Sequence, residues 1–153
     1  MRRILVSVVV LVFVVAGCHV NREIGMEREI VKSGKAPAAI GPYSQAVRVG
    51  NTLYCSGQIA IDPSTGELVG ESIEAETRQV LENLRAVIED AGFALSDVVK
   101  TTVYMADMED YAKINAVYGE YFGECPPALA AVQVANLPKY VKVEISCIAV
   151  RSE

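Results

Sequence analysis

The sequence contains few of the residues that build metal sites and thiol-based active sites. Its only histidine is His19, and its four cysteines show no Cys-x-x-Cys pair and no Cys/His spacing. These gaps exclude a recognisable zinc site and a Cys–His nucleophile pair, so we expect no bound metal. Cys55 and Cys147 lie in apolar stretches, which predicts that both are ordinary core residues.

Positive charge is also scarce. The chain has 14 Lys and Arg against 19 Asp and Glu, a formal net charge of -5, and no run of basic residues follows the first three positions. A polyanion would meet net repulsion, so we expect no nucleic-acid partner. The length of 153 residues suits one domain better than two.

The longest apolar run lies near the N-terminus. Residues 4–15 are apolar except for Ser7 and follow two arginines. The run is too short for a stable membrane-spanning anchor but fits a secretory signal. Its end, Val-Ala-Gly-Cys at 15–18, resembles the lipobox of bacterial lipoproteins. This resemblance predicts a lipoprotein signal peptide at 1–18, an acylated Cys18 and an extracytoplasmic protein attached to the membrane through its lipid.

The sequence leaves open a second translation start at Met26. Met26 lies about ten residues before the first domain residue, and translation from it would leave out the signal and give a cytoplasmic protein. Residues 19–35 are polar and are predicted to be a linker, with the option of a short strand at 29–31. The domain is then expected at 36–153.

Apolar periodicity within this domain predicts strands and two helices. Gly50 and Asn51 suit a tight hairpin turn between two short strands, and Gly92 is placed to end the first helix. The expected strands cover 46–49, 52–55, 98–105 and two segments within 126–150 that a short turn at Asn136–Lys139 joins. The expected helices cover 72–91 and 109–122. This order predicts an α+β fold in which both helices cover one face of a mixed sheet.

The last predicted strand alternates strictly. Apolar residues at 141, 143, 145 and 147 share one face, and Lys142, Glu144 and Ser146 share the other. Glu144 must therefore face water, a charged partner or a ligand. The face that the helices leave uncovered also carries Tyr54 and Ser56 and is too apolar for full exposure, which predicts burial against other subunits.

Several stretches together resemble the RidA (YjgF, or L-PSP) family: APAAIGPYSQAV at 36–47, CSGQIAIDPSTGELV at 55–69, residues 78–122 and VANLPKYVKVEISCIAV at 134–150. The resemblance covers nearly all of 36–151. It implies a chorismate-mutase-like fold, a homotrimer with clefts between subunits, and no metal or organic cofactor. It also implies hydrolysis of reactive enamines and imines, such as 2-aminoacrylate, to 2-oxo acids and ammonia.

The resemblance assigns roles to individual residues. The family's water-activating glutamate matches Glu144, and its cleft tyrosine, serine and asparagine match Tyr43, Ser56 and Asn115. A carboxylate that orients water, with donors holding the rest of the imine, fits this chemistry. The plainer alternatives are a Glu144 bound to Lys142 or backbone amides, a loop aromatic, a turn serine and a helix-edge amide.

One matched position departs from the family. Its deaminases carry an arginine that binds the substrate carboxylate, whereas this chain has Leu129, which shares a strand face with Ala131 and Gln133. Leucine offers no hydrogen-bond donor, and loss of a desolvated charge partner costs about 2–5 kcal/mol. Leu129 is then a pocket wall, and Arg48, Arg78 or Arg85 would have to replace the missing charge.

Three functions remain open from the sequence. The first is a RidA-like enamine/imine deaminase. The second is a non-catalytic or altered-specificity ligand-binding lipoprotein, because a leucine-lined cleft favours a less charged ligand. The third is an endoribonuclease or translation inhibitor, which the acidic charge opposes.

Overall fold

A computed structural model describes residues 27–152. The predicted signal peptide, its lipidation site Cys18 and the alternative start at Met26 lie outside the described residues. The described chain contains six strands, two α-helices and three short 3-10 helices. In chain order they are β1 Arg28–Val31, β2 Ala46–Val49, β3 Thr52–Gln58, α1 Ile73–Asp90, η1 Leu95–Asp97, β4 Val98–Met105, η2 Met108–Asp110, α2 Tyr111–Phe122, β5 Ala128–Gln133, η3 Pro138–Tyr140 and β6 Val143–Val150.

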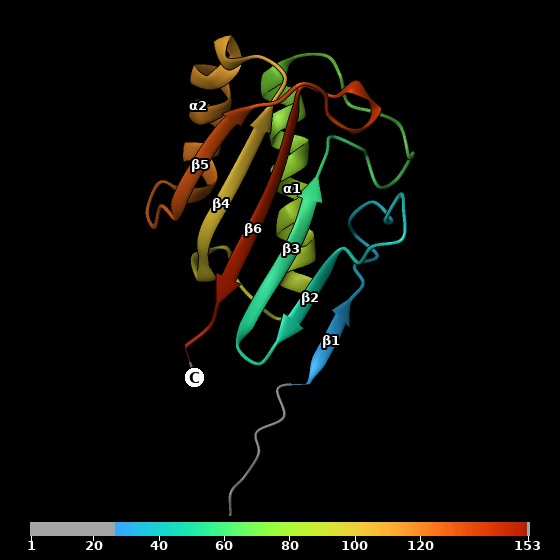
Figure 1. Cartoon of the computed structure of the whole chain (residues 1–153), viewed down its shortest axis with the longest axis vertical. Helices are drawn as coiled ribbons and strands as arrows, with labels where there is room; N and C mark the ends of the chain where they lie inside the picture. Colours follow the sequence, from blue (N-terminus) through green and yellow to red (C-terminus); the bar gives the residue numbers. More distant parts are fainter. Residues whose placement is uncertain (1–26, 153) are drawn as a thin grey trace, which may run out of the picture.

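The strands form one mixed sheet in the order β1-β2-β3-β6-β4-β5. β4 and β5 pair in parallel, and all other neighbours pair antiparallel. Both helices lie behind this sheet in Figure 1, which confirms the predicted α+β arrangement. The edge strand β1 lies within the 19–35 linker segment and covers the optional short strand expected at 29–31.

The sequence interpretation of the closing strands needs one correction. They were read as two strands joined by a short turn at Asn136–Lys139, but β5 and β6 are not neighbours, because β4 lies between them. The parallel pairing of β5 with β4 requires a crossover, and α2 supplies it. Residues 134–142 then lead back across the end of β4 to β6.

Helix α1 has clear start and stop signals. Ser72 is its N-cap and accepts a hydrogen bond from the Ala75 backbone N–H at 3.1 Å. Gly92, at φ +78°, follows its last turn, and the Phe93 N–H bonds back to the Ile88 carbonyl at 3.1 Å. The helix therefore matches the predicted range within one residue at each end.

Strand β6 separates the two faces of the sheet. Val143, Ile145 and Cys147 are buried beneath the helices, while Glu144 and Ser146 are half-buried on the opposite side. Cys147 lies directly across from the equally buried Cys55 of β3, as expected for core residues. We call the uncovered side the open face; its residues include Tyr54, Ser56, Lys100, Thr102, Tyr104, Glu144, Ser146 and Ile148.

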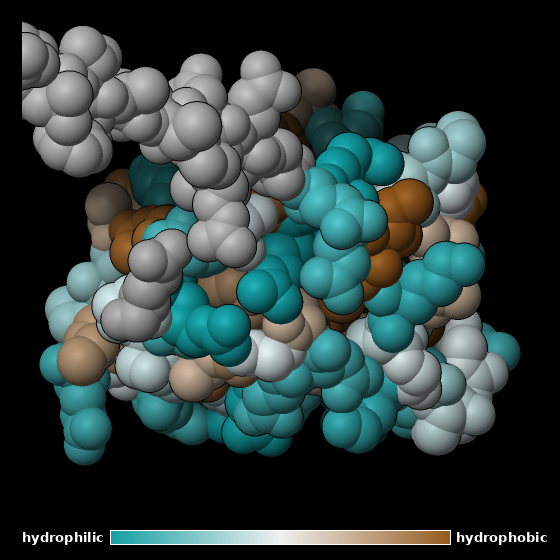
Figure 2. All heavy atoms as spheres, turned by 90° about the horizontal axis from the view of Figure 1, so that it is seen from below, coloured by the Kyte–Doolittle hydropathy of each residue, from teal (hydrophilic) through white to brown (hydrophobic). Residues whose placement is uncertain are grey.

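The open face carries a large aromatic side chain that is about half exposed in the single chain: Tyr54 is 49% exposed. At the end of the molecule shown in Figure 2, hydrophilic side chains predominate and hydrophobic ones form separate patches. Within residues 27–152, no helix has the length and apolarity needed to cross a bilayer.

Candidate active site

A β-bulge shapes the part of the open face that carries the candidate residues. Cys55 pairs with Cys147 and Gln58 with Ile145, so β3 advances three residues where β6 advances two. The extra residue disrupts the ladder locally and brings Gly57 against the side chain of Glu144. A Cβ built on Gly57 would lie 2.6 Å from Cδ and 2.8 Å from Cγ of Glu144. Only glycine leaves room for the carboxylate at this place.

Three of the five predicted site residues line one cavity of about 310 Å³. Glu144 comes from β6, Ser56 from β3, and Tyr43 from the loop before β2. The complete lining is Ile40, Tyr43, Ser56, Gly57, Ile59, Pro138 and Glu144. A carboxyl and two hydroxyls thus face the same space, with apolar side chains around them.

Glu144 has a raised pKa because burial disfavours its charged form. Within residues 27–152 its carboxylate has no ion pair and no hydrogen bond that offsets this burial. The alternative in which Lys142 pairs with Glu144 is wrong: the Lys142 ammonium lies 3.6 Å from Glu76 of α1. The Lys142 backbone N–H also donates to Glu76, at 3.0 Å.

The two hydroxyls are oriented by the backbone. Tyr43 Oη accepts the N–H of Ile40 at 3.2 Å, which leaves its own proton free to donate. Ser56 Oγ donates to the carbonyl of Ser44 at 2.7 Å, which leaves its lone pairs free to accept. Tyr43 therefore presents a donor to the cavity, and Ser56 presents an acceptor.

Buried amides fix the segments that carry these residues. Gln45 bonds through its side chain to the Ser33 N–H at 2.7 Å and to the Pro37 carbonyl at 2.8 Å, which anchors the loop before Tyr43. Asn83 of α1 donates to the carbonyls of Ile59 and Ile61 at 3.0 and 2.8 Å. The sequence analysis missed both amides. A signal for Asn83 existed, since a polar residue stands on the apolar stripe of the helix.

Asn115 and Leu129 lie apart from this cavity. Leu129 pairs with Thr101, whose hydroxyl lies 2.7 Å from that of Tyr118 on α2. Leu129 is thus on the helix side of the sheet, at its edge, and is 37% exposed. Asn115 is exposed on α2, three residues before Tyr118. Asn115 and Leu129 therefore do not meet Tyr43, Ser56 and Glu144 within one chain, and the clefts between subunits that the resemblance implies stay a prediction.

The arginines considered as replacements for the missing cation are engaged elsewhere. Arg78 forms a two-pronged pair with Glu120, at 2.6 and 3.0 Å. Arg85 pairs with Glu82 on its own helix. Arg48 donates to the Gly50 carbonyl at 2.9 Å. None of the three lines the cavity around Glu144.

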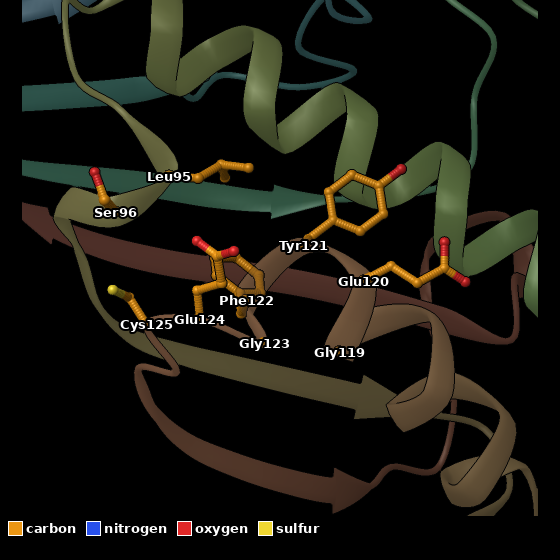
Figure 3. Close-up of a pocket in the computed structure, with 9 residues that line it drawn as sticks. All are labelled: Leu95, Ser96, Gly119, Glu120, Tyr121, Phe122, Gly123, Glu124 and Cys125. Atoms are coloured by element: carbon orange, nitrogen blue, oxygen red, sulfur yellow. The ribbon is translucent and has the colours of Figure 1, made fainter.

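A second cavity, of about 350 Å³, lies between η1 and the C-terminal end of α2 (Figure 3). It contains none of the residues predicted for the site. Its lining consists of Leu95, Ser96, Gly119, Glu120, Tyr121, Phe122, Gly123, Glu124 and Cys125. Among residues 27–152, no three His, Cys, Asp or Glu side chains are grouped to hold a metal ion.

Comparisons with known proteins cover most of the chain. The family model described as Endoribonuclease L-PSP matches residues 33–151. A RutC family protein of Pyrococcus horikoshii is 56% identical over 122 residues, 80% of this chain and 97% of that one. A 2-iminobutanoate/2-iminopropanoate deaminase of Mus musculus is 50% identical over 124 residues, 81% and 92% of the two chains. The crystal structure of E. coli TdcF with bound serine matches with a TM-score of 0.77 and 44% identity, covering 81% of this chain and 99% of that one.

Proposed function

Since the chain belongs to the RidA/YjgF (L-PSP) family and has its chorismate-mutase-like fold, we propose that it hydrolyses reactive enamines and imines to carbonyl compounds and ammonia. The observation that carries the proposal is Glu144, a carboxyl with raised pKa in a cavity that also holds Tyr43 and Ser56. Relatives named as imine deaminases support it. The resemblance suggests substrates of the 2-aminoacrylate type, which give 2-oxo acids.

In the proposed reaction Glu144 accepts a proton from water while the water oxygen bonds to the imine carbon. The π electrons of the C=N bond move to nitrogen, and a carbinolamine forms. Glu144 returns the proton to that nitrogen, which completes the neutral carbinolamine. Glu144 then takes the proton of the carbinolamine hydroxyl and delivers it to the nitrogen, while the C=O bond forms, the C–N bond breaks and ammonia leaves. A raised pKa brings Glu144 closer to neutral pH, where such a residue is most effective, and general acid–base catalysis contributes about 10²–10⁴-fold.

The two hydroxyls position the imine in this scheme. The Ser56 oxygen accepts an N–H of the imine, and the free Tyr43 proton donates to the attacking water or to the oxygen of the product. Each role uses the lone pair or the proton that the hydrogen bond to the backbone leaves free. Glu144 is then the catalytic residue, and Tyr43 and Ser56 bind the substrate.

The positions of Asn115 and Leu129 support an oligomeric site. These residues lie on the helix side of the sheet, whereas Glu144 lies on the open face. A second copy that covers the open face with its α2–β5 edge would bring both groups to one cleft. We propose the homotrimer that the family resemblance implies, with one cleft at each subunit boundary.

The test is hydrolysis of enzymatically generated 2-aminoacrylate by the purified full chain. Glu144→Gln removes the base and should abolish turnover, and Leu129→Arg restores a cation to the cleft. Leu129→Met is the matched control, because it changes the side chain without adding charge. Turnover by the wild type, lost with Glu144→Gln, supports the proposal. If neither the wild type nor Leu129→Arg hydrolyses the imine, the proposal is wrong.

One observation favours a second function. Leu129 presents an apolar side chain where the resemblance expects an arginine, which suits a non-catalytic or altered-specificity protein that binds a less charged ligand. An inactive wild type that Leu129→Arg makes active would support this alternative. No observation favours an endoribonuclease beyond the description of the family model, and the net charge of -5 opposes an RNA substrate.

We also propose that lipidated Cys18 holds the protein at a membrane outside the cytoplasm. The support is the lipobox-like sequence at 15–18 behind a basic and apolar segment. The mass of the N-terminal peptide from native cells tests this. A diacylated or triacylated Cys18 is the expected result, and a chain that begins at Met26 contradicts it.

A further inference from the structure

The charges around the Glu144 cavity bear on the class of substrate. The cavity lining contains one ionisable carboxyl, Glu144, and no lysine or arginine. A neighbouring hollow of about 290 Å³ shares Gly57, Pro138 and Glu144 with it and adds polar, uncharged groups. These two hollows thus present a single charge, which is negative when Glu144 is ionised.

Three lysines lie close to these hollows in the sequence or on the open face, but none of them lines either hollow. Lys142 pairs with Glu76 at 3.6 Å. Lys139 follows Pro138 but does not line either hollow. Lys100 is on the open face opposite Ile148, four residues along β6 from Glu144, or about 13 Å at the usual strand rise. The linings of the two hollows themselves thus offer no ammonium or guanidinium group to an anion bound beside Glu144.

The hydrogen-bonding groups of the side chains also disfavour a bound carboxylate. Glu144 and Ser56 both present acceptors to the cavity, and Tyr43 presents one donor. A bound carboxylate has two oxygens that need about four donors and would also be repelled by ionised Glu144. A protonated imine brings N–H donors and positive charge, which match two acceptors and one carboxylate.

The rest of the cavity is apolar. Ile40, Ile59 and Pro138 complete its wall beside the polar groups. On the opposite side of the sheet, Leu129 adds a further apolar side chain to the edge that a second copy would bring to the cleft. Small aliphatic substituents fit these surfaces, since they lose water on binding and need no polar partner.

From this distribution of charge and hydrogen-bonding groups we propose that the preferred substrates are imines and enamines that carry no carboxylate and have aliphatic substituents. The inference rests on the proposed imine hydrolysis and narrows it. The reaction is unchanged: R₂C=NH and water give R₂C=O and ammonia, with no oxidant or further reactant. The products are neutral aldehydes or ketones instead of 2-oxo acids.

The test compares two imines that differ by one carboxylate. A flavin amine oxidase acting on 3-methylbutylamine gives the imine without a carboxylate, and an L-amino-acid oxidase acting on leucine gives 2-imino-4-methylpentanoate. Catalase removes the peroxide from both reactions. Cyanoborodeuteride reduces the remaining imine to a deuterium-labelled amine or amino acid, and mass spectrometry measures how far the full-length protein lowers that signal.

The proposal expects kcat/KM for the carboxylate-free imine to exceed that for the imino acid by at least about tenfold. Glu144→Gln should abolish both activities, and Leu129→Arg should shift the preference toward the imino acid, whereas Leu129→Met should not. Equal or greater activity on the imino acid overturns this inference and leaves imine hydrolysis standing. Activity on neither imine overturns the proposed function itself, and the inference with it.

Discussion

The side chain of Glu144 lies directly against the backbone of Gly57, so close that a Cβ at position 57 would overlap it. Gly57→Ala should therefore push the carboxylate out of the cavity. We expect a fall in kcat/KM of about 100-fold for imine hydrolysis, since a displacement of about 1 Å is enough for such a loss. Stability should stay within about 1 kcal/mol, because the flexible end of the glutamate can move aside.

Gly70→Ala is the matched control for this variant, because a Cβ at Gly70 meets nothing within 4 Å. It should leave kcat/KM and the melting temperature at wild-type values. A Gly57→Ala protein with full activity would show that turnover does not depend on the position of the Glu144 side chain against Gly57.

Burial of Glu144 should also appear in the pH dependence of stability. Its folded-state pKa is raised from 4.5 by desolvation, so the folded protein holds the proton more tightly than the unfolded chain does. The resulting contribution to stability is fully present below the unfolded pKa and is lost as pH rises through the folded pKa. Glu144→Gln, which stays neutral, should therefore gain stability relative to wild type as pH rises above 4.5.

Urea unfolding of the two proteins between acidic and neutral pH measures this difference. Glu67→Gln replaces an exposed carboxylate and serves as the control for a general change of charge. A free-energy difference between Glu144→Gln and wild type that stays flat or narrows with rising pH would contradict the proposed burial effect.

The proposed shared cleft predicts complementation between inactive variants. In each proposed cleft one subunit contributes its open face, and the neighbouring subunit contributes α2. Glu144→Gln disables the first of these two halves, and Asn115→Ala disables the second. Co-expression of the two should restore activity, because roughly a quarter of the clefts in a random mixture pair two intact halves. Glu144→Gln mixed with Tyr43→Phe should restore nothing, since both changes affect the same half. Failure of the first pair to recover activity would place all catalytic groups in one chain.

A buried hydroxyl pair ties α2 to the sheet. Thr101 Oγ1 and Tyr118 Oη lie 2.7 Å apart, and burial raises the pKa of Tyr118. Thr101→Val leaves the tyrosine hydroxyl without this partner and should lower the free energy of unfolding by about 1–3 kcal/mol. The double variant with Tyr118→Phe should lose less than the two single losses together. Additive losses in urea unfolding would show that the two hydroxyls act independently.

Local pattern predicted much of the fold. The alternation at 143–147 correctly placed Glu144 on the face opposite the core. It fails before β6, because Val141 packs with Ile59 and Leu137 and Lys142 pairs with Glu76 of α1. The helix ends at Ser72 and Gly92 follow from capping chemistry. The pairing of β5 with β4 was missed, because strand neighbours depend on long-range packing that periodicity does not encode. Asn136 and Pro138, residue types common in turns, lie between the two strands and therefore favoured the interpretation as a hairpin.

The site was predictable only in part for a similar reason. Motif matches chose Tyr43, Ser56 and Glu144, which do meet in one cavity, but they also chose Asn115 and Leu129, which lie on the other side of the sheet. A linear motif carries no record of which chain supplies each residue. The bulge that brings Gly57 to Glu144 likewise depends on the register between β3 and β6.

The two buried amides hold the walls of the cavity unequally. Asn83 fastens the Ile59–Ile61 segment to α1 at two carbonyls, while Gln45 fastens its loop at Ser33 and Pro37, away from the exposed stretch that carries Ile40 and Tyr43. The Ile59 side of the cavity is thus bonded directly to α1, whereas Ile40 and Tyr43 are held by the bond between them and by the anchored segments beside them. We expect ligands of different bulk to be accommodated on the Ile40–Tyr43 side, because fewer bonds join that side to the core.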